Sequence, residues 1–247
     1  GDSLQITHNI QYHPLKICSG DVSWTTCSDE SSPLLVLFYQ DQGTFTPSAA
    51  GTYTYICAYH DTMIGQIVVQ ASAGGTGDPH LVFANGAKAD FRGSDDGYYN
   101  FLSFPGISLN IRTQSSVFKL RNVTVDGTFI TEIFINGITS DGKHIHFEHS
   151  TLRANDQNWG WKMVKGWCDD ALFYVIPHGK KTCGKDFRVS VEASRSDVTF
   201  KQWTFQFRTN YVYHNIKGTK HRIDMKIKGP RTEVSHGIIG QSFNRKI

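Results

Sequence analysis

Long hydrophobic runs are missing from this 247-residue sequence, and no stretch approaches the roughly 18 apolar residues of a membrane-spanning helix. Charge is sparse and balanced as well. Lys and Arg number 25 against 22 Asp and Glu, which gives a formal net charge of +3 without any basic cluster. Proteins that bind nucleic acid through its phosphates usually concentrate Lys and Arg on one face. The sequence therefore predicts neither a membrane span nor a nucleic-acid partner.

Catalytic signatures are also absent. The chain contains no G-x-S-x-G, H-E-x-x-H or P-loop motif, and no local pattern groups its Ser, His and Asp residues. The N-terminal stretch GDSLQITHN has neither the basic start nor the apolar segment of a signal peptide. We therefore predict that the protein is not an enzyme. If it is secreted, we expect its signal peptide to have been removed already.

Cysteine is sparse, with five residues, but the placement of the five is informative. Cys18 and Cys27 lie close together, Cys168 and Cys183 bracket a second segment, and Cys57 is left over. Two local disulfides and one free thiol are the economical interpretation. A disulfide that closes a loop of about 15 residues stabilises the fold by about 3 kcal/mol in the chain-entropy model. Disulfides indicate an oxidising compartment, and the alternative is a cytosolic protein with five free thiols.

One sequon adds to the case for an extracellular or cell-surface location. Asn122 precedes Val123 and Thr124, which predicts a glycosylation site at Asn122. Sequons also arise by chance, so the cysteines carry more of the argument for secretion.

Short runs rich in Val, Ile, Thr, Tyr and Phe recur along the whole chain, with apolar residues at alternate positions. Gly, Pro, Ser and Asp separate these runs at intervals of about ten residues, as in antiparallel sandwiches. The segment ASAGGTGDP, 71–79, is small, flexible and rich in turn residues. We therefore predict an all-β protein with two β-sandwich domains, 1–71 and 78–247, joined by a linker at 72–77.

The stretch YICAYHDTMIGQIVV, 55–69, places Cys57, His60 and Met63 at intervals of three between two β-type runs. A thiolate, two imidazoles and a distant thioether form the ligand set of a blue-copper site. A tight loop can turn all three side chains of this stretch toward one point. A second histidine must then come from elsewhere in the fold.

Two histidines near the N-terminus are candidates for that ligand. His13 shares a strand face with Leu15 and Ile17, so its side chain would project from the end of the core. His8 is the alternative, on the face of an earlier strand. We favour His13 as the second imidazole.

The order of motifs in residues 1 to about 70 resembles the cupredoxin family. A Gly-Asp turn precedes an apolar strand, HPLKI opens with a histidine, and GTFTPSAAGTYTYIC runs into the loop AYHDTM and the strand IGQIVV. The C-x-x-H-x-x-M spacing is that of short-loop members such as amicyanin. The resemblance implies a Greek-key β-sandwich that binds one type 1 copper through His13, Cys57, His60 and Met63. The alternative is a copper-free β-sandwich in which Cys57 and Met63 merely pack.

Three features depart from the family pattern. Pro14 stands where the family usually has Asn, and proline has no N–H to donate, so the hydrogen bonds around the ligand loop must differ. Tyr59 replaces the proline that many members have before the second histidine. Family members also carry a strand before the Gly-Asp turn, whereas this sequence begins at Gly1. We expect that first strand either upstream in a longer precursor or replaced by an open sheet edge.

The second domain opens with GTGDPHLVFANGAKADFRGSDDGYYNF, which resembles the start of von Willebrand factor type D domains. The segment HGIIGQSF, 236–243, is similar to their closing Gly-rich segment. Most cysteines of the vertebrate members are missing, so a mucin-type disulfide-linked assembly is not expected. The matching residues of the opening segment are Gly77, Asp78, Pro79, His80, Phe83, Gly86, Asp90, Phe91, Gly93 and Tyr99.

In some relatives the peptide bond within GDPH cleaves itself, so the bond between Asp78 and Pro79 is a candidate self-cleavage site. An Asp carboxyl beside a proline amide is acid-labile because it can attack its own carbonyl carbon. The plainer interpretation, which we favour, is a turn in which His80 packs.

Two further groups of residues carry metal-binding side chains. HIHFEH places His144 and His146 on one strand face, with His149 following, and a solvated face is favoured over a two-histidine site. Carboxylates in loops are Ca²⁺ candidates, but no EF-hand spacing supports them. These carboxylates are Asp95, Asp96, Asp169 and Asp170.

The two resemblances together favour an extracellular copper-binding module within a secreted matrix, coat or filament that assembles with other protein chains. Copper would then act as a stabilising clip. The alternative function is a soluble extracellular electron-transfer or copper-handling protein that cycles Cu(I) and Cu(II) with a redox partner. No second copper site is visible, so an oxidase or nitrite reductase is not expected.

Overall fold

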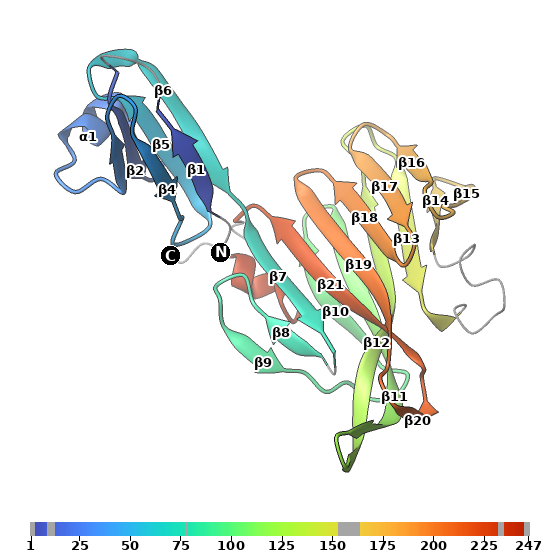
Figure 1. Ribbon diagram of the computed structural model, residues 1–247. Helices are drawn as coiled ribbons and strands as arrows, with labels where there is room; N and C mark the ends of the chain where they lie inside the picture. The colour runs from blue at the N-terminus through green and yellow to red at the C-terminus, as the bar shows by residue number, and fades with distance from the viewer. Residues whose placement is uncertain (1–2, 9–12, 78, 153–163, 232–234, 245–247) are drawn as a thin grey trace. The chain divides into compact units, whose positions relative to one another are not determined.

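The computed structural model describes residues 3–8, 13–77, 79–152, 164–231 and 235–244, which divide into two compact units, Gly1–Ala71 and Ser72–Ile247 (Figure 1). Both units consist mainly of antiparallel β-sheets with only short helices, so the predicted all-β class is confirmed. No helix among the described residues has the length and apolar character needed to cross a membrane.

The described residues of the first unit form a two-stranded sheet, a four-stranded sheet and one short helix. Its elements are β1 (Leu4–Thr7), β2 (Leu15–Ser19), α1 (Trp24–Asp29), β3 (Leu35–Leu37), β4 (Gln42–Phe45), β5 (Gly51–Cys57) and β6 (His60–Val69). β1 pairs with β4, and the larger sheet has the order β3-β2-β5-β6. The central strands β2 and β5 therefore bring residues near the N-terminus beside the Cys57 stretch.

Both faces of the four-stranded sheet are covered by apolar groups. On one face Ile17 packs with Phe45 of β4 and with Tyr53. On the other face Cys18 and Ile56 pack against helix α1. The sheet is therefore the central layer of this small unit, and period-two alternation in β2 assigns its residues to the two faces.

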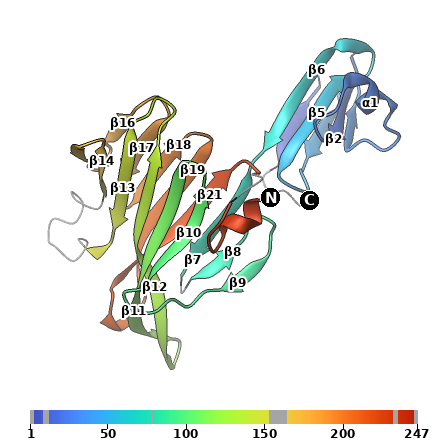
Figure 2. The same ribbon diagram turned by 180° about the vertical axis from the view of Figure 1, so that it is seen from behind.

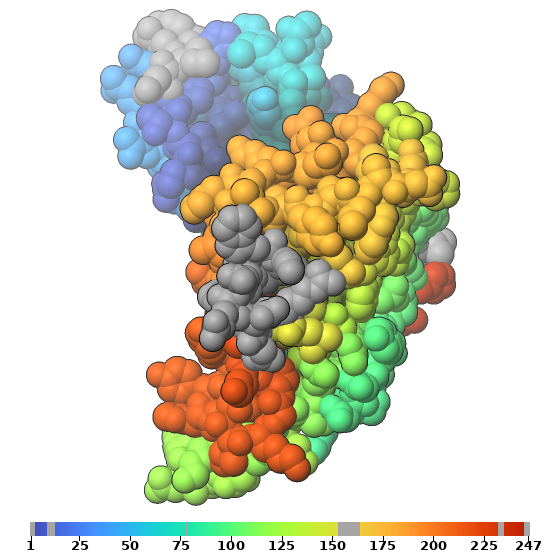
Figure 3. All heavy atoms as spheres, turned by 90° about the vertical axis from the view of Figure 1, so that its right-hand side faces the viewer, coloured from blue at the N-terminus to red at the C-terminus, as the bar shows by residue number. Residues whose placement is uncertain are grey.

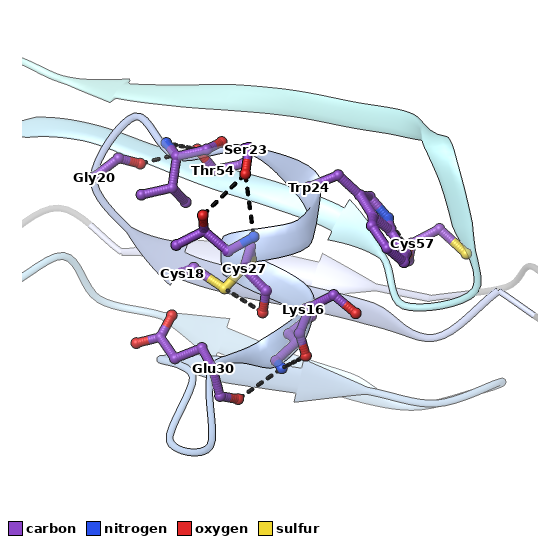
Figure 4. Close-up of a disulfide and its surroundings, with 12 residues drawn as sticks. Lys16, Cys18, Gly20, Ser23, Trp24, Cys27, Glu30, Thr54 and Cys57 are labelled. Carbon is purple, nitrogen blue, oxygen red and sulfur yellow. Dashed lines mark hydrogen bonds between the residues drawn. A yellow bond between two sulfur atoms is a disulfide. The ribbon is translucent and has the colours of Figure 1, made fainter.

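Helix α1 is held to the sheet at two points (Figure 4). The Cys18–Cys27 disulfide joins β2 to the helix, as the cysteine spacing predicts. Lys16 Nζ donates hydrogen bonds to the carbonyl oxygens of Ser28 and Glu30, at 2.8 and 2.7 Å, where the helix ends. These carbonyls lack helical partners, so a lysine ammonium stabilises the helix end.

The second unit contains a seven-stranded and an eight-stranded sheet. Its first elements are β7 (Ala71–Thr76), β8 (His80–Val82), β9 (Lys88–Asp90), β10 (Tyr98–Phe104), β11 (Ile107–Leu120), β12 (Val123–Ile138), β13 (His144–Ser150), β14 (Val164–Cys168) and β15 (Ala171–Tyr174). The remaining elements are β16 (Lys180–Cys183), β17 (Phe187–Glu192), β18 (Arg195–Phe200), β19 (Trp203–Tyr211), β20 (Asn215–Gly218), β21 (His221–Gly229) and the 3₁₀ helix Gly240–Phe243. The sheet orders are β10-β11-β12-β13-β14-β15, with β20 beside β11, and β16-β17-β18-β19-β21-β7-β8-β9.

The two sheets of this unit pack face to face (Figure 2). Phe147 of β13 in one sheet lies 6.4 and 6.1 Å, between ring centroids, from Phe187 and Phe207 of the other. The Cys168–Cys183 disulfide joins β14 to β16 and so links the two sheets covalently. Both predicted disulfides are thus confirmed, and the predicted sandwich has its core between these sheets.

The long hairpin of β11 and β12 extends to the pair Leu120 and Val123. Near its end β20 pairs with β11, and Figure 3 shows the two segments side by side. Asn122 lies exposed in the turn of this hairpin. The predicted glycosylation site is therefore accessible, and its modification stays a prediction.

Residues 72–77 do not form the predicted flexible linker, because Ala71–Thr76 is strand β7 between β21 and β8. Ala71, Ala73 and Gly75 are buried. A side chain at Gly74 would place its Cβ 2.2 Å from the Met225 carbonyl oxygen. The small residues thus allow the backbones of β7 and β21 to approach closely. Close approach of another backbone is one reason why glycine occurs within a strand.

We expect Gly74→Ala to destabilise the second unit by about 3 kcal/mol, because the methyl group would meet backbone of β21 that cannot move without separating the strands. Thermal unfolding of the whole chain measures the loss. Gly75→Ala is the matched control, since its Cβ would meet only side-chain ends, Leu81 Cδ2 at 3.0 Å and Ile130 Cδ1 at 3.9 Å. Equal losses for the two variants would contradict this explanation.

Candidate metal centre

Three side chains with metal-binding atoms converge at one end of the four-stranded sheet. Cys57 Sγ lies 3.6 Å from His13 Nδ1 and 3.2 Å from His60 Nδ1. The ligand atoms of the three residues all lie within 4.8 Å of one another, and the two imidazoles stack with centroids 4.4 Å apart. Within the described parts of the chain, this is the one group of three or more His, Cys, Asp or Glu side chains so arranged.

Strand pairing brings His13 to this position. Leu15 of β2 lies opposite Cys57 of β5, so the residues just before Leu15 reach the end of β5. The Ala58 N–H then donates to the Pro14 carbonyl oxygen at 2.8 Å. Proline has no N–H, but its carbonyl holds the ligand loop here. Pro14 therefore still takes part in a hydrogen bond to the ligand loop, because it acts as the acceptor, and proline lacks only the donor.

A tight hairpin places the other two members of the group. Cys57 pairs with His60 across the turn, and the next pair is Ile56 with Ile64. Residues 61–63 therefore form an irregularity in β6, and Met63 lies within it with 40 % of its surface exposed. The part of Met63 as a metal ligand stays a prediction.

His8, the alternative second histidine, is not in the group. Its Nδ1 lies 3.1 Å from the Phe38 carbonyl oxygen, and its backbone N–H donates to the Asp41 carbonyl. The side chain is buried against this neighbouring loop. The second imidazole beside Cys57 and His60 is therefore that of His13.

The three ligand residues differ in exposure. Cys57 is a free thiol with 4 % of its surface exposed, His13 is half-buried and His60 is exposed. The Trp24 indole N–H donates to the Cys57 carbonyl oxygen at 2.8 Å, and Figure 4 shows the indole beside Cys57. The thiol is thus shielded from water, while one imidazole faces solvent.

The separations suit a single soft or borderline metal ion. Metal–sulfur bonds of about 2.3 Å and metal–nitrogen bonds of about 2.0 Å put neighbouring ligands about 3.3–3.8 Å apart in a tetrahedral site. The two sulfur–nitrogen separations of 3.2 and 3.6 Å are close to this range. A thiolate with two imidazoles is also a donor set that copper and zinc both accept.

Three of the four loop carboxylates considered for Ca²⁺, Asp95, Asp96 and Asp169, are engaged by protein donors. Asp95 accepts a hydrogen bond from a backbone N–H of β11, and Asp96 accepts one from Arg112 at 2.8 Å. The ammonium of Lys143, 2.7 Å from Asp169, lowers the pKa of that carboxyl. Nothing in these contacts gathers carboxylates around a common point.

The histidines of HIHFEH divide between the two faces of β13. His144 is exposed, and His146 bonds to Asn136 through Nδ1 and to Glu148 through Nε2. His149 is fully buried on the opposite face, which sequence analysis did not predict. Strict alternation along the strand would have indicated it, because residue 149 has the parity of the apolar residues 145 and 147.

Within the GDPH motif, Asp78 lies outside the described residues, so its predicted self-cleavage stays untested. Pro79 is buried, and its carbonyl accepts a hydrogen bond from the Phe91 N–H at 3.0 Å. The expected packing of His80 is wrong, because its side chain is 68 % exposed and its Nδ1 lies 2.6 Å from Asp90. The packed residue of the turn is the proline.

Comparisons with protein-family models and with curated proteins find no match to this chain. The cupredoxin and von Willebrand type D resemblances therefore stay predictions from motifs.

Proposed function

We propose that the first unit binds one copper ion through His13, Cys57 and His60, with Met63 as a weaker fourth ligand. The observation that carries the proposal is the convergence of a thiol and two imidazoles from segments 44 residues apart in sequence. The thioether three residues beyond His60 favours copper over zinc, since thioether sulfur is a copper ligand and zinc sites use Cys, His and carboxylates.

Each surrounding residue has a definite part in such a site. Bound copper would supply a one-electron couple between Cu(I) and Cu(II). Burial of Cys57 keeps water from the sulfur, and the hydrogen bonds from Trp24 and to Pro14 both hold the peptide group that joins Cys57 to Ala58. The exposed His60 leaves one edge of the site open to solvent or to a partner.

We further propose that the protein works outside the cell, as a copper-stabilised module of a secreted matrix, coat or filament with a von Willebrand type D-like second unit. The two disulfides support an oxidising compartment. Strand β6 supports assembly: within the described residues it pairs on its β5 side alone, and it exposes Ile64 and Val68. A ten-residue edge strand of this kind can pair with a strand of another chain.

The alternative function is soluble electron transfer or copper handling with a redox partner. It is favoured by Tyr59 and His60, which are exposed directly beside the buried thiol. A reversible one-electron potential and reduction by a soluble partner would support this alternative. Concentration-dependent assembly, with copper inert to mild reductants, would support the structural function.

Titration of the metal-free chain with Cu(II) tests the copper site. We expect one equivalent to bind and a blue or green thiolate-to-Cu(II) charge-transfer band to develop in proportion.

Parallel titration with Zn(II) gives the metal preference, and Met63→Leu should retain copper but shift its reduction potential. Absence of both the band and stoichiometric copper would reject the proposal. Tighter binding of Zn(II) than of Cu(II) would assign the group to zinc.

A further inference from the structure

The outer face of the seven-stranded sheet carries an open depression of about 440 Å³ that the copper proposal does not involve. Figure 2 shows this sheet in front of the eight-stranded one. Strands β10 to β13 supply the lining, which consists of aromatic rings, carboxamides and one imidazole. The lining residues are Tyr98, Tyr99, Asn100, Asn110, Phe134, Asn136 and His146.

The strand register places the lining side chains other than Tyr99 together on one face, whereas Tyr99 lies opposite the buried Ile111. Asn100 lies opposite Asn110, Asn110 lies opposite Phe134, and Asn136 lies opposite His146. Side chains of directly opposed residues stand on the same side of a sheet, and the intervening residues point into the core. Apart from a register shift between Asn100 and Leu102, the depression is built from paired strands that fix the spacing of its side chains.

A row of neighbouring rings crosses this face, and its last pair, His146 and Trp167, is inclined at 54°. The Tyr98 and Phe134 centroids are 6.1 Å apart at 32°, and those of Phe134 and His146 are 6.3 Å apart at 30°. Trp167 of β14 continues the row, 5.1 Å from His146. Tyr98 is 64 % exposed, with the Arg112 guanidinium 5.5 Å from its ring centroid, whereas the other three rings are partly buried. Tyr98 therefore offers a ligand the most accessible ring of the row. Flat aromatic faces of this kind can stack on the C–H faces of a ligand ring.

Two carboxamides beside the rings have free donors. The Asn110 carbonyl accepts from Asn100 Nδ2 at 3.0 Å, and the Asn136 carbonyl is bonded to His146 Nδ1. The Nδ2 groups of Asn110 and Asn136 donate to no residue that the structure describes. Their N–H groups are thus oriented by the bonds at the other end of each amide, and they are available to acceptor atoms of a ligand.

The charged groups around the depression neutralise one another. Arg112 Nη1 lies 2.6 Å from Glu132, and Lys165 Nζ lies 2.7 Å from Glu148. All four of these side chains are less than 20 % exposed. The charged pairs described on this face thus leave neither Arg112 nor Lys165 uncompensated for a phosphate or sulfate group, and their chemistry suits an uncharged ligand with many hydroxyl groups.

We propose that this face binds a neutral oligosaccharide. The sugar rings stack on Tyr98 and Phe134, and hydroxyl oxygens accept hydrogen bonds from Nδ2 of Asn110 and Asn136. The open, shallow form of the depression suits a chain that crosses the strands. This binding is independent of copper, because all the residues that carry it belong to the second unit.

Isothermal titration calorimetry of the whole chain with cellohexaose, laminarihexaose, mannohexaose and chitohexaose tests the proposal. We expect saturable binding of at least one hexasaccharide, and binding about tenfold weaker after Tyr98→Ala, because one stacked ring is lost. Tyr211→Ala is the matched control, since Tyr211 is 66 % exposed but lies on β19, outside this face. It should bind as the wild type does.

Thermal unfolding checks that both variants keep the fold, and Asn136→Ala provides a second variant that removes a donor without removing a ring. Absence of binding by all four sugars at millimolar concentration would overturn the proposal. Equal weakening by Tyr98→Ala and Tyr211→Ala would also overturn it, and so would tighter binding of the polyanion heparin than of every neutral sugar. Unchanged sugar affinity in Cys57→Ser would support the independence from copper.

Discussion

Cys57→Ser is expected to abolish the copper charge-transfer band and to weaken copper binding more than about a hundredfold. Cys57 supplies the single sulfur of the described three-residue group, and both imidazoles direct Nδ1 at it. A serine hydroxyl is a hard ligand that stays protonated near neutral pH, so it replaces neither the bond nor the electronic transition. Visible absorption together with elemental analysis of the purified variant measures both losses.

Two histidine variants distinguish the loss of a copper ligand from a general loss of folding. His13→Gln should weaken copper binding, whereas His8→Gln should leave the band intact because His8 bonds to the Phe38 carbonyl away from the group. Thermal unfolding of the metal-free proteins shows whether each variant is folded. If Cys57→Ser keeps both the band and stoichiometric copper, the proposed site is wrong.

His149 is expected to make the protein sensitive to mild acid. Burial lowers the pKa of His149 to about 4 from an ordinary value of 6.5, and its two ring nitrogens lie 2.7 and 2.8 Å from the hydroxyl groups of Ser196 and Thr209. Above pH 6.5 the ring is neutral in the folded and unfolded states. Between pH 6.5 and 4 only the unfolded state binds the proton, so stability falls with pH by about 3 kcal/mol.

Denaturant unfolding between pH 4 and 7 measures this loss. His149→Gln should be less stable at pH 7 but should lose about 3 kcal/mol less on acidification than the wild type. His144→Gln is the matched control, because it removes an exposed histidine from the same strand and should keep the wild-type pH dependence. An unchanged acid loss in His149→Gln would contradict the assignment to this side chain.

Several features of the protein follow from local sequence alone. Period-two alternation determines strand formation and the faces of each strand, which is why the all-β class is predictable. The two disulfides join cysteines separated by 9 and 15 residues, and such short separations limit the alternative pairings. Cys57 and His60 are brought together by one tight turn, so their proximity is also a local property.

Other features depend on segments that are distant in sequence. The sequence favours His13 over His8, but the proximity of His13 to Cys57 depends on the β2–β5 register. The proposed sugar-binding face likewise depends on the alignment of β10 to β13. Residues 72–77 also show that local sequence is insufficient. Their small, Gly-rich composition is typical of a linker, but Gly74 lies in close contact with the backbone of another strand. A Gly-rich composition indicates only how much backbone conformational freedom the unfolded chain has. Only tertiary packing determines whether a glycine is flexible or is required because no Cβ fits beside another strand's backbone.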